Sequence, residues 1–335
     1  MLRHSSDDEP GYSRKRHGRY WQYFDDDGKR VTDRDEIDRL NSIALPPAYT
    51  DAWFCKDANG HIQATGRDAR GRKQYRYHAD YRAQQDAEKY DGCLEFGEAL
   101  PKLRARIEKD LRKRKLTREA VLAAVVRLLD TEHVRVGNEQ YAKANKSFGL
   151  TTLRVRHLKK IGSRMKMRFR GKHGIVHEVV LNDANIKRIV KQCQDLPGQN
   201  LFQYENGDGV PKAVTSADVN DYIREATGSD FTAKHFRTWG ASVIFFEQLL
   251  HKDEEDRLSI KTALEPVAEA LGNTPAISRK SYVHPRLIDA VQDDKEDPLH
   301  GMKRPRARRR LSTAETGFLK FLKKKPRKAR RKKLA

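Results

Sequence analysis

The hydrophobic positions of the chain follow two patterns, and the change between them comes at about residue 79. Before it, short runs of aromatic and β-branched residues flank turns with the sequence Asp-Gly or Asn-Gly. These dipeptides tolerate the positive φ of a tight turn, so the runs predict β-hairpins. The expected strand pairs are 19–24 with 29–32 and 52–55 with 61–65, and a short helix is expected at 33–43.

After residue 79, Leu, Ile, Val and Ala recur at intervals of three and four, which is typical of helices with one buried face. One strand pair interrupts the helices, because residues 165–169 alternate between hydrophobic and polar and residues 175–181 return after a glycine-flanked turn. The second part is therefore expected to be mostly helical with one small sheet. The expected helices are 79–90, 98–113, 118–135, 183–193, 216–226, 233–250 and 260–271.

The two ends of the chain differ in composition from the rest. Residues 1–18 are polar, and residues 302–335 hold 16 Lys or Arg against one acid, Glu315. Both ends have the composition of segments that bury too little to become ordered. We therefore predict an α+β protein with a disordered start (1–18), a β-rich domain (19–80), a mostly helical domain (81–301) and a disordered basic tail (302–335).

The formal net charge of +22 points to nucleic acid as the partner, with a membrane surface as the weaker alternative. The tail supplies +15 of this charge, which leaves +7 for the remaining chain. The sequence contains no run of 18 apolar residues, which is the length needed to span a bilayer. The start of the chain lacks the apolar core of a signal peptide. The three cysteines are far apart and odd in number, so they indicate reduced structural thiols in an intracellular protein.

The glycine spacing of residues 66–73 is similar to that of a phosphate-binding loop, but the sequence fails the test for one. Such a loop needs Lys followed by Ser or Thr after its second glycine, and Arg72 and Lys73 stand there instead. Neither a metalloprotease His-Glu motif nor a calcium loop is found. We therefore expect no ATP, no metal site and no other cofactor.

Cations alternate with aromatic residues just after the second predicted hairpin. Cations neutralise phosphates, while Tyr and Gln side chains can reach sugars or base edges, so this segment is a candidate for DNA contacts. A solvated charged strand with half-buried tyrosines is the plainer alternative. The candidate contacts are Arg67, Arg70, Arg72, Lys73, Gln74, Tyr75 and Tyr77.

Four residues of the helical part share the chemistry that a phosphodiester under attack requires. Charge develops on its nonbridging oxygens, and rigid guanidinium donors such as Arg135 and Arg237 meet it best. Lys172, at the tip of the predicted strand pair, could donate a proton to a leaving oxygen. Asn273, which follows Gly272, could add a neutral hydrogen bond.

Tyr282 lies among cations in the stretch Ser-Arg-Lys-Ser-Tyr-Val-His, where it could be a nucleophile. A phenol with a pKa of about 10 is mostly protonated near neutrality, so it needs a cationic pocket to attack. Each of these residues taken alone has a plainer explanation: a surface cation, a helix C-cap for Asn273, or a core aromatic for Tyr282. The occurrence of all five residues in one chain and in this order favours a catalytic role over these plainer explanations.

The ordered set resembles the active site of the type IB DNA topoisomerases, particularly the small poxvirus-like enzymes found in bacteria. The matching residues are Arg135, Lys172, Arg237, Asn273 and Tyr282. Three longer stretches carry the resemblance as well, and it covers roughly residues 18–300. These stretches are Gly66–Tyr75, Ser147–Leu153 and Leu271–Tyr282.

The resemblance implies a C-shaped clamp in which the two domains close around duplex DNA. Tyr282 would join the 3′ phosphate of one strand and release a 5′ hydroxyl, the broken strand would rotate, and the hydroxyl would reseal the nick without ATP. Arg135 and Arg237 match the arginines that contact the scissile phosphate. Lys172 matches the lysine that protonates the leaving hydroxyl, and Lys234 matches a lysine that assists.

The resemblance carries further expectations about single residues and about the setting. Asn273 stands where viral and eukaryotic relatives have histidine, so it is expected to act by hydrogen bonding without titrating. Gln74, Tyr75 and Tyr77 match residues that the viral enzymes place in the major groove. The family also implies a monomer that prefers supercoiled duplex DNA and works on the nucleoid in a bacterial cytoplasm, with the basic tail adding salt-sensitive affinity.

Two other classes share part of this pattern. Tyrosine recombinases use the same Arg, Lys, Arg and Tyr, but they usually carry histidine three positions before the second arginine, where this chain has Lys234. Their N-terminal domain is helical, whereas hairpins are predicted here. An architectural DNA-binding protein would fit the charge equally well, but it would have no use for Tyr282.

Overall fold

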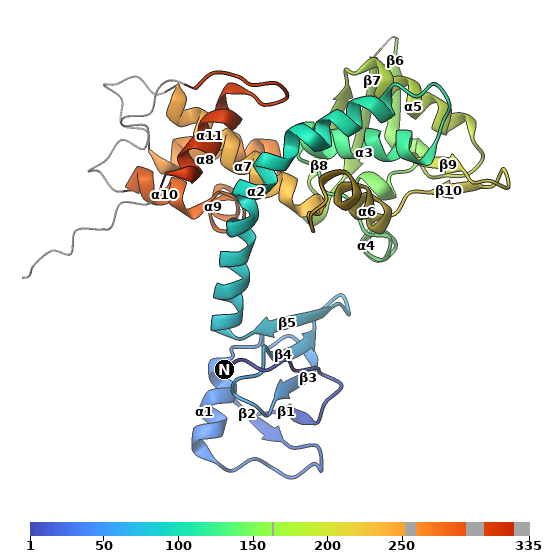
Figure 1. Cartoon of the computed structure of the whole chain (residues 1–335). Coiled ribbons are helices and arrows are strands. Elements are labelled where there is room, and N and C mark those ends of the chain that lie inside the picture. The colour runs from blue at the N-terminus through green and yellow to red at the C-terminus, as the bar shows by residue number, and fades with distance from the viewer. Residues whose placement is uncertain (163, 252–258, 293–304, 325–335) are drawn as a thin grey trace, which may run out of the picture. The chain divides into compact units, whose positions relative to one another are not determined.

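The computed structural model describes residues 1–162, 164–251, 259–292 and 305–324 (Figure 1). The chain forms two compact units, Met1–Asp91 and Gly92–Ala335. The first is a β-sheet with one helix, and the second is mostly helical with two small sheets, so the predicted α+β class is confirmed. The boundary between the units falls after Asp91 rather than after residue 80, inside the long helix α2 (Ala79–Leu111).

The N-terminal unit is built on five antiparallel strands in the order β2-β1-β3-β4-β5 (Figure 1). The predicted pairing of 52–55 with 61–65 is confirmed, since Phe54 lies opposite Ala64. The predicted short helix is α1, which begins where the Asp33 side chain accepts from the Asp35 amide at 3.0 Å. The elements are β1 (Gly11–His17), β2 (Tyr20–Phe24), α1 (Arg34–Ser42), β3 (Thr50–Cys55), β4 (Ile62–Arg67) and β5 (Lys73–Tyr77).

The prediction that residues 1–18 are disordered is wrong. β1 lies inside the sheet between β2 and β3, and Ser5 is buried, with its hydroxyl donating to the Ile62 carbonyl at 3.0 Å. Several polar side chains of this segment contact other protein groups. Arg14, for example, stacks 4.1 Å from the Trp21 ring centroid and donates to the Leu45 carbonyl at 2.8 Å.

The first predicted hairpin forms only in part. The turn closes, because the Val31 amide donates to the Tyr23 carbonyl at 2.9 Å, but residues 29–32 contribute only one bridge, Phe24 to Arg30. The long partner of β2 is β1, with five residue pairs from Ser13–Phe24 to His17–Tyr20. The sequence of β1, Gly-Tyr-Ser-Arg-Lys-Arg-His, is mostly polar and does not indicate a strand, so this pairing cannot be predicted from the sequence alone.

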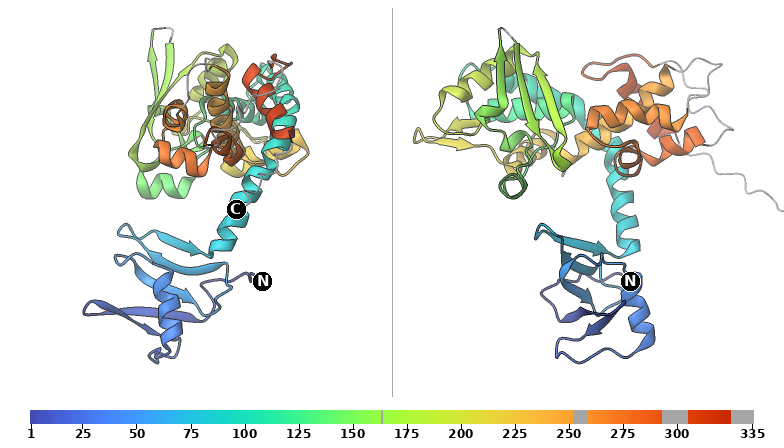
Figure 2. Two further views of the ribbon diagram at one scale, coloured as in Figure 1. Left: turned by 90° about the vertical axis from the view of Figure 1, so that its left-hand side faces the viewer. Right: turned by 180° about the vertical axis from the view of Figure 1, so that it is seen from behind.

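The second unit contains nine helices besides α2, a three-stranded antiparallel sheet and a two-stranded one within the described residues (Figure 2). The strand pair predicted at 165–169 and 175–181 is confirmed as β7 and β8, and β6 adds a third strand. The helices are α3 (Arg118–Glu132), α4 (Glu139–Asn145), α5 (Ala184–Asp195), α6 (Ser216–Thr227), α7 (Ala233–Leu250), α8 (Ile260–Leu271), α9 (Pro275–Ser281), α10 (Pro285–Gln292) and α11 (Thr313–Lys323). The strands are β6 (Leu158–Ile161), β7 (Arg164–Arg170), β8 (Val176–Leu181), β9 (Gln203–Glu205) and β10 (Pro211–Ala213).

Helix α3 is the centre of this unit. Every residue from Ala120 to Val126 is buried, and α5, α6, α7 and β9 pack around the helix. A helix that is hydrophobic on all sides needs such a cover. Thr117 caps its start by accepting from the Ala120 amide, so both the start and the apolar sequence of α3 follow from local residues.

One continuous helix, α2, replaces the two helices predicted at 79–90 and 98–113. Helix α2 contains Gly92 and Gly97 in its interior, although glycine weakens helices. Gly97 instead gives room to a neighbour, because a Cβ there would lie 2.2 Å from the Trp239 ring. The glycine is needed for packing against α7.

The basic tail is folded over part of its length, so the prediction of disorder is wrong for residues 305–324. Helix α11 packs on α7, and Phe318 is fully buried against Trp239 and Phe246. Ser312 and Glu315 form a capping box at its start. The rest of the predicted tail, 302–304 and 325–335, lies outside the described residues.

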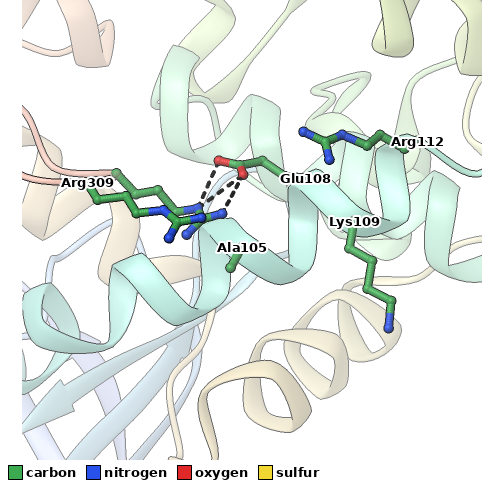
Figure 3. Close-up of a pocket in the computed structure, with 6 residues that line it drawn as sticks. Ala105, Glu108, Lys109, Arg112 and Arg309 are labelled. Atoms are coloured by element: carbon green, nitrogen blue, oxygen red, sulfur yellow. Dashed lines mark hydrogen bonds and ion pairs between the residues drawn. The ribbon is translucent and has the colours of Figure 1, made fainter.

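Ion pairs join α11 and the turn before it to α2 and α3. Arg104 binds Asp130 at 2.8 Å and Glu315 at 2.7 Å, and Glu315 also accepts from the Trp239 indole at 3.1 Å. Arg310 binds Glu108 at 2.8 Å, at a cation-rich pocket on α2 (Figure 3). Glu315 and Arg310 of the segment thus anchor it to α2.

Removing the Phe318 side chain should unfold this unit more easily. Phe318→Ala would leave a cavity between α7 and α11 and lower the free energy of unfolding by about 3–5 kcal/mol. Urea unfolding followed by circular dichroism measures this. Lys323→Ala, which breaks only the exposed pair with Glu98, is the matched control and should cost less than about 1 kcal/mol. Equal stability of the two variants would contradict the packing of α11.

Candidate active site

Arg135 lies in the loop that follows α3, and a second segment braces this loop. The Leu150 amide donates to the Arg135 carbonyl at 3.0 Å, and the Thr151 amide donates to the Val136 carbonyl at 2.7 Å. The segment can come this close only because residue 149 is glycine. A Cβ on Gly149 would lie 2.6 Å from the Arg135 carbonyl oxygen. The stretch Ser147–Leu153 therefore fixes the backbone of Arg135.

Arg237 is a buried arginine in the second turn of α7, with 5% of its surface exposed. It donates to the carbonyl of His133, the C-cap of α3, and at 3.0 Å to the carbonyl of Leu271, the last residue of α8. Its guanidinium carbon lies 4.8 Å from the centroid of the Tyr282 ring. Arg237 thus ties the ends of two helices to Tyr282.

Asn273 follows the end of α8, where Gly272 adopts the left-handed φ of 59°. Its backbone amide donates to the Ala268 carbonyl at 2.9 Å, and its side-chain oxygen accepts from Arg135 at 3.1 Å. The Asn273 Nδ2 is buried and has no hydrogen-bond partner among the described residues. The amide group is therefore able to donate to an incoming acceptor.

Tyr282 terminates α9, and its position is set from both sides. Its amide donates to the Ser278 carbonyl at 3.0 Å. The buried Ser242 hydroxyl of α7 accepts from the His284 amide at 2.9 Å and lies 3.4 Å from the Tyr282 carbonyl. The phenol oxygen lies 3.4 Å from Arg135, so the structure brings together Arg135, Arg237, Asn273 and Tyr282.

The two lysines of the predicted set lie outside this cluster. Lys172 begins the single turn Lys172–Gly174 between β7 and β8, and Lys234 lies in the first turn of α7; both are exposed. Within the described residues, neither makes a hydrogen bond or ion pair with the clustered four. Their side chains extend into solvent.

The cluster is strongly positive. No carboxylate in the described part of the chain pairs with Arg135 or Arg237. Burial, and then the charge of Arg135, lowers the pKa of Arg237 to about 10. Burial raises the pKa of Tyr282, but Arg237 and Arg135 outweigh it, so this pKa lies below its usual value. The arrangement favours an anion at the site and a phenol ready to lose its proton.

The N-terminal candidates lie on the hairpin of β4 and β5, and the carboxylate of Asp68 organises its turn. Asp68 accepts from the Arg72 guanidinium at 2.8 Å, the Gln74 amide at 3.1 Å and the Arg70 backbone at 2.9 Å. The bond to Arg72 is the main reason that the pKa of Asp68 is lowered to about 2. Arg67 donates to the Gly71 carbonyl at 3.0 Å.

The alternation of β5 separates these candidates into two faces. Lys73, Tyr75 and Tyr77 are exposed on one face, where the two tyrosine rings stack with centroids 6.0 Å apart. Arg72 and Gln74 lie on the other face, half-buried and bound by Asp68. The side chain of Arg70 is exposed at the turn. Arg67 is exposed as well, so the accessible members of the set are Arg67, Arg70, Lys73, Tyr75 and Tyr77.

Two family models match the chain. "Eukaryotic DNA topoisomerase I, catalytic core" matches residues 78–306, and "Bacterial DNA topoisomerase IB, N-terminal domain" matches residues 20–68. The first covers more than half of the chain and includes all six predicted catalytic residues. The chain belongs to the type IB DNA topoisomerases.

Viral relatives match this topoisomerase over most of their length. DNA topoisomerase 1B of Acanthamoeba polyphaga mimivirus is 34% identical over 298 residues, which is 85% of this chain and 88% of the relative. DNA topoisomerase 1B of vaccinia virus is 22% identical over 295 residues, 81% of this chain and 90% of the relative. A solved XerH site-specific recombinase has 17% identity over 57% of this chain and 51% of its own, with a TM-score of 0.35. That likeness is too small to support the recombinase alternative.

Several residues that support the site of this topoisomerase were not expected from the sequence. Ser242 is fully buried in α7, and no motif distinguishes it from a core serine. His177 lies beside Gly171 and Gly272, although nothing in the alternation of β8 marks it. Gly149 lies in a stretch that carried the resemblance, but only the structure gives the reason for the glycine.

Two kinds of feature are absent from the described residues. No helix there is long and apolar enough to cross a bilayer. No group of three or more His, Cys, Asp and Glu residues there is arranged to hold a metal ion.

The electrostatics of the site predict how the Tyr282 phenol titrates. Its pKa should lie below 10, and Arg135→Gln should raise it because a cation next to the phenolate is lost. Carbon-13 NMR of ring-labelled tyrosine, with Tyr282→Phe to assign the signal, measures both values. Arg224→Gln, which removes an exposed arginine on α6, is the control and should leave the titration unchanged. The same midpoint with and without Arg135 would contradict the proposed coupling.

Proposed function

We propose that this topoisomerase relaxes supercoiled duplex DNA by cutting one strand, letting it rotate and resealing it, with Tyr282 as the nucleophile. The observation that carries the proposal is the placement of the Tyr282 hydroxyl 3.4 Å from Arg135, beneath the buried guanidinium of Arg237. A phosphodiester is the anion that such a site suits. It carries a negative charge, which pairs with the two arginines that have no carboxylate partner. Its phosphorus is the atom that the phenol can attack.

The cleavage step exchanges one phosphoester for another. The Tyr282 oxygen forms a bond to phosphorus as the bond from phosphorus to the 5′ oxygen breaks, which leaves a 3′ phosphotyrosine. The phenol gives its proton to solvent water, and the departing 5′ oxygen takes one from Lys172, which regains it from solvent. Resealing runs the same steps backwards. Because the phosphoester bond is conserved throughout, no ATP is required. The two arginines supply the positive charge that a metal ion could otherwise bring to the phosphate.

Each of the other residues has a role that its surroundings support. Arg135 and Arg237 hold the nonbridging oxygens as their charge grows during attack. Asn273 donates its unused Nδ2 to the same phosphate and does so without titrating. Lys234, exposed one turn before Arg237 on α7, assists from the DNA side.

The N-terminal unit and the basic segments supply the contacts to duplex DNA. Lys73, Tyr75 and Tyr77 form one exposed face of β5, with Arg70 at the neighbouring turn, and this face suits a groove and its phosphates. The exposed cations of the C-terminal segment, such as Arg308 and Arg309, add affinity that depends on salt rather than on sequence. We infer a monomer that closes as a clamp on supercoiled DNA in the nucleoid of a bacterial cytoplasm, which the match to a bacterial N-terminal domain supports.

Plasmid relaxation tests the proposal. Wild-type protein should relax supercoiled plasmid in EDTA and without ATP, whereas Tyr282→Phe should relax none of it, because the variant lacks the attacking oxygen. Tyr81→Phe, on α2 outside the cluster, is the matched control and should retain activity. Gel-shift assays should give the same DNA affinity for all three proteins. Relaxation by Tyr282→Phe would overturn the assignment, and binding without relaxation by wild type would favour an architectural role.

A further inference from the structure

His177 lies at the active site but has no part in the mechanism above. It is the second residue of β8 and pairs with Phe169 of β7. The two rings stack with centroids 5.3 Å apart and an angle of 19° between their planes. This stacking holds the half-buried imidazole at the end of the hairpin that carries Lys172.

The imidazole fills the space between two glycines that each precede a residue of the site. A Cβ on Gly171, next to Lys172, would lie 2.6 Å from the His177 Cδ2. A Cβ on Gly272, next to Asn273, would lie 2.7 Å from the Cε1 on the other side of the ring. The ring is therefore in close contact with both backbones.

The backbone on each side is connected to the catalytic cluster. On one side, Arg237 binds the carbonyl of Leu271 at 3.0 Å, and Arg135 binds Asn273 at 3.1 Å. On the other side, the Gly171 amide donates to the Ile175 carbonyl at 2.7 Å and closes the turn of Lys172. A shift of the ring would thus move the turn of Lys172 relative to the arginines and Tyr282.

The charge state of His177 suits a spacer rather than a proton carrier. Burial lowers the pKa of His177, and the nearby Arg135 and Arg237 lower it further. The ring is consequently neutral near neutral pH and does not add a third cation that would repel the guanidiniums. Its contribution is its volume and shape.

We propose that His177 is a positioning residue. Its ring sets the distance between the Gly171-Lys172 turn and the Gly272-Asn273 turn, and this distance allows Lys172 to reach the leaving 5′ oxygen. The exposed Lys172 side chain makes no hydrogen bond or ion pair within the described residues, so the place of its backbone decides where its ammonium can reach. The inference rests on the proposed role of Lys172 as proton donor. An error in placing such a donor by about 1 Å can cost about a hundredfold in rate.

The test compares two DNA substrates under single-turnover conditions. One has the normal 5′ oxygen at the cleavage site, and the other has sulfur in its place. A thiol is a much stronger acid than an alcohol, so the thiolate leaves without a proton from Lys172. His177→Ala should slow cleavage of the oxygen substrate by about tenfold to a hundredfold. It should cleave the sulfur substrate at nearly the wild-type rate and bind both DNAs normally.

A second variant tests the contact from the opposite side. Gly171 has a φ of −88°, which any residue adopts, so Gly171→Ala harms the site only through its collision with the ring. This variant should show the same defect on the oxygen substrate. Adding His177→Ala removes the ring that the methyl meets, so the double variant should be no slower than His177→Ala alone. Val180→Ala, exposed on the same strand, is the matched control and should cleave normally.

The outcomes separate this inference from the function on which it rests. Lys172→Ala should be slow on oxygen and normal on sulfur; if sulfur does not rescue it, the role of Lys172 fails and the inference about His177 fails with it. If sulfur rescues Lys172→Ala but His177→Ala is equally slow on both substrates, or normal on both, only the role of His177 is overturned. Additive defects of Gly171→Ala and His177→Ala would also contradict the contact.

Discussion

The site depends on holding two guanidiniums close together without a carboxylate to neutralise them. Like charges repel, and burial makes the repulsion stronger because less water screens it. Arg237 is stabilised instead by the carbonyls at the ends of α3 and α8. Helix C-termini carry partial negative charge, so they stabilise the cation and leave the site positive overall. A carboxylate would stabilise Arg237 more, but it would neutralise the positive charge that makes the site attractive to an anion.

This constraint explains why distant parts of the unit matter to the site. The C-cap of α3 must be fixed for its carbonyl to meet Arg237, and Asp130, one turn earlier, is anchored through Arg104 to Glu315 of α11. On the other side of the site, Arg286 of α10 binds the carbonyls of Leu322 and Lys324 at the end of α11. The C-terminal helix therefore supports both the loop of Arg135 and the segment that follows Tyr282.

The sequence indicated the four clustered residues better than the segments that support them. Arg135, Arg237, Asn273 and Tyr282 could be identified because their chemistry and order are distinctive, and the helices that carry them follow from apolar spacing. Helix α11 was missed because the many cations of 302–335 indicated a disordered tail. The apolar residues Phe318, Leu319 and Phe321, which follow the Ser312 N-cap at helical spacing, were outweighed by this charge. Strand β1 was missed because its side chains are polar, and only the folded sheet supplies Trp21 and the Leu45 carbonyl to Arg14. His177 could not be found from sequence, since its importance lies in two glycines from distant turns.

The measurement that tests this account most directly is the identification of the covalent intermediate. Wild-type protein is mixed with supercoiled plasmid and denatured during turnover, the DNA is trimmed with nuclease, and the peptides are sequenced by mass spectrometry. The account predicts one modified peptide, with a nucleotide 3′ phosphate on the Tyr282 oxygen and a free 5′ hydroxyl on the other side of the break. An adduct on another residue, or on a 5′ phosphate, would contradict it.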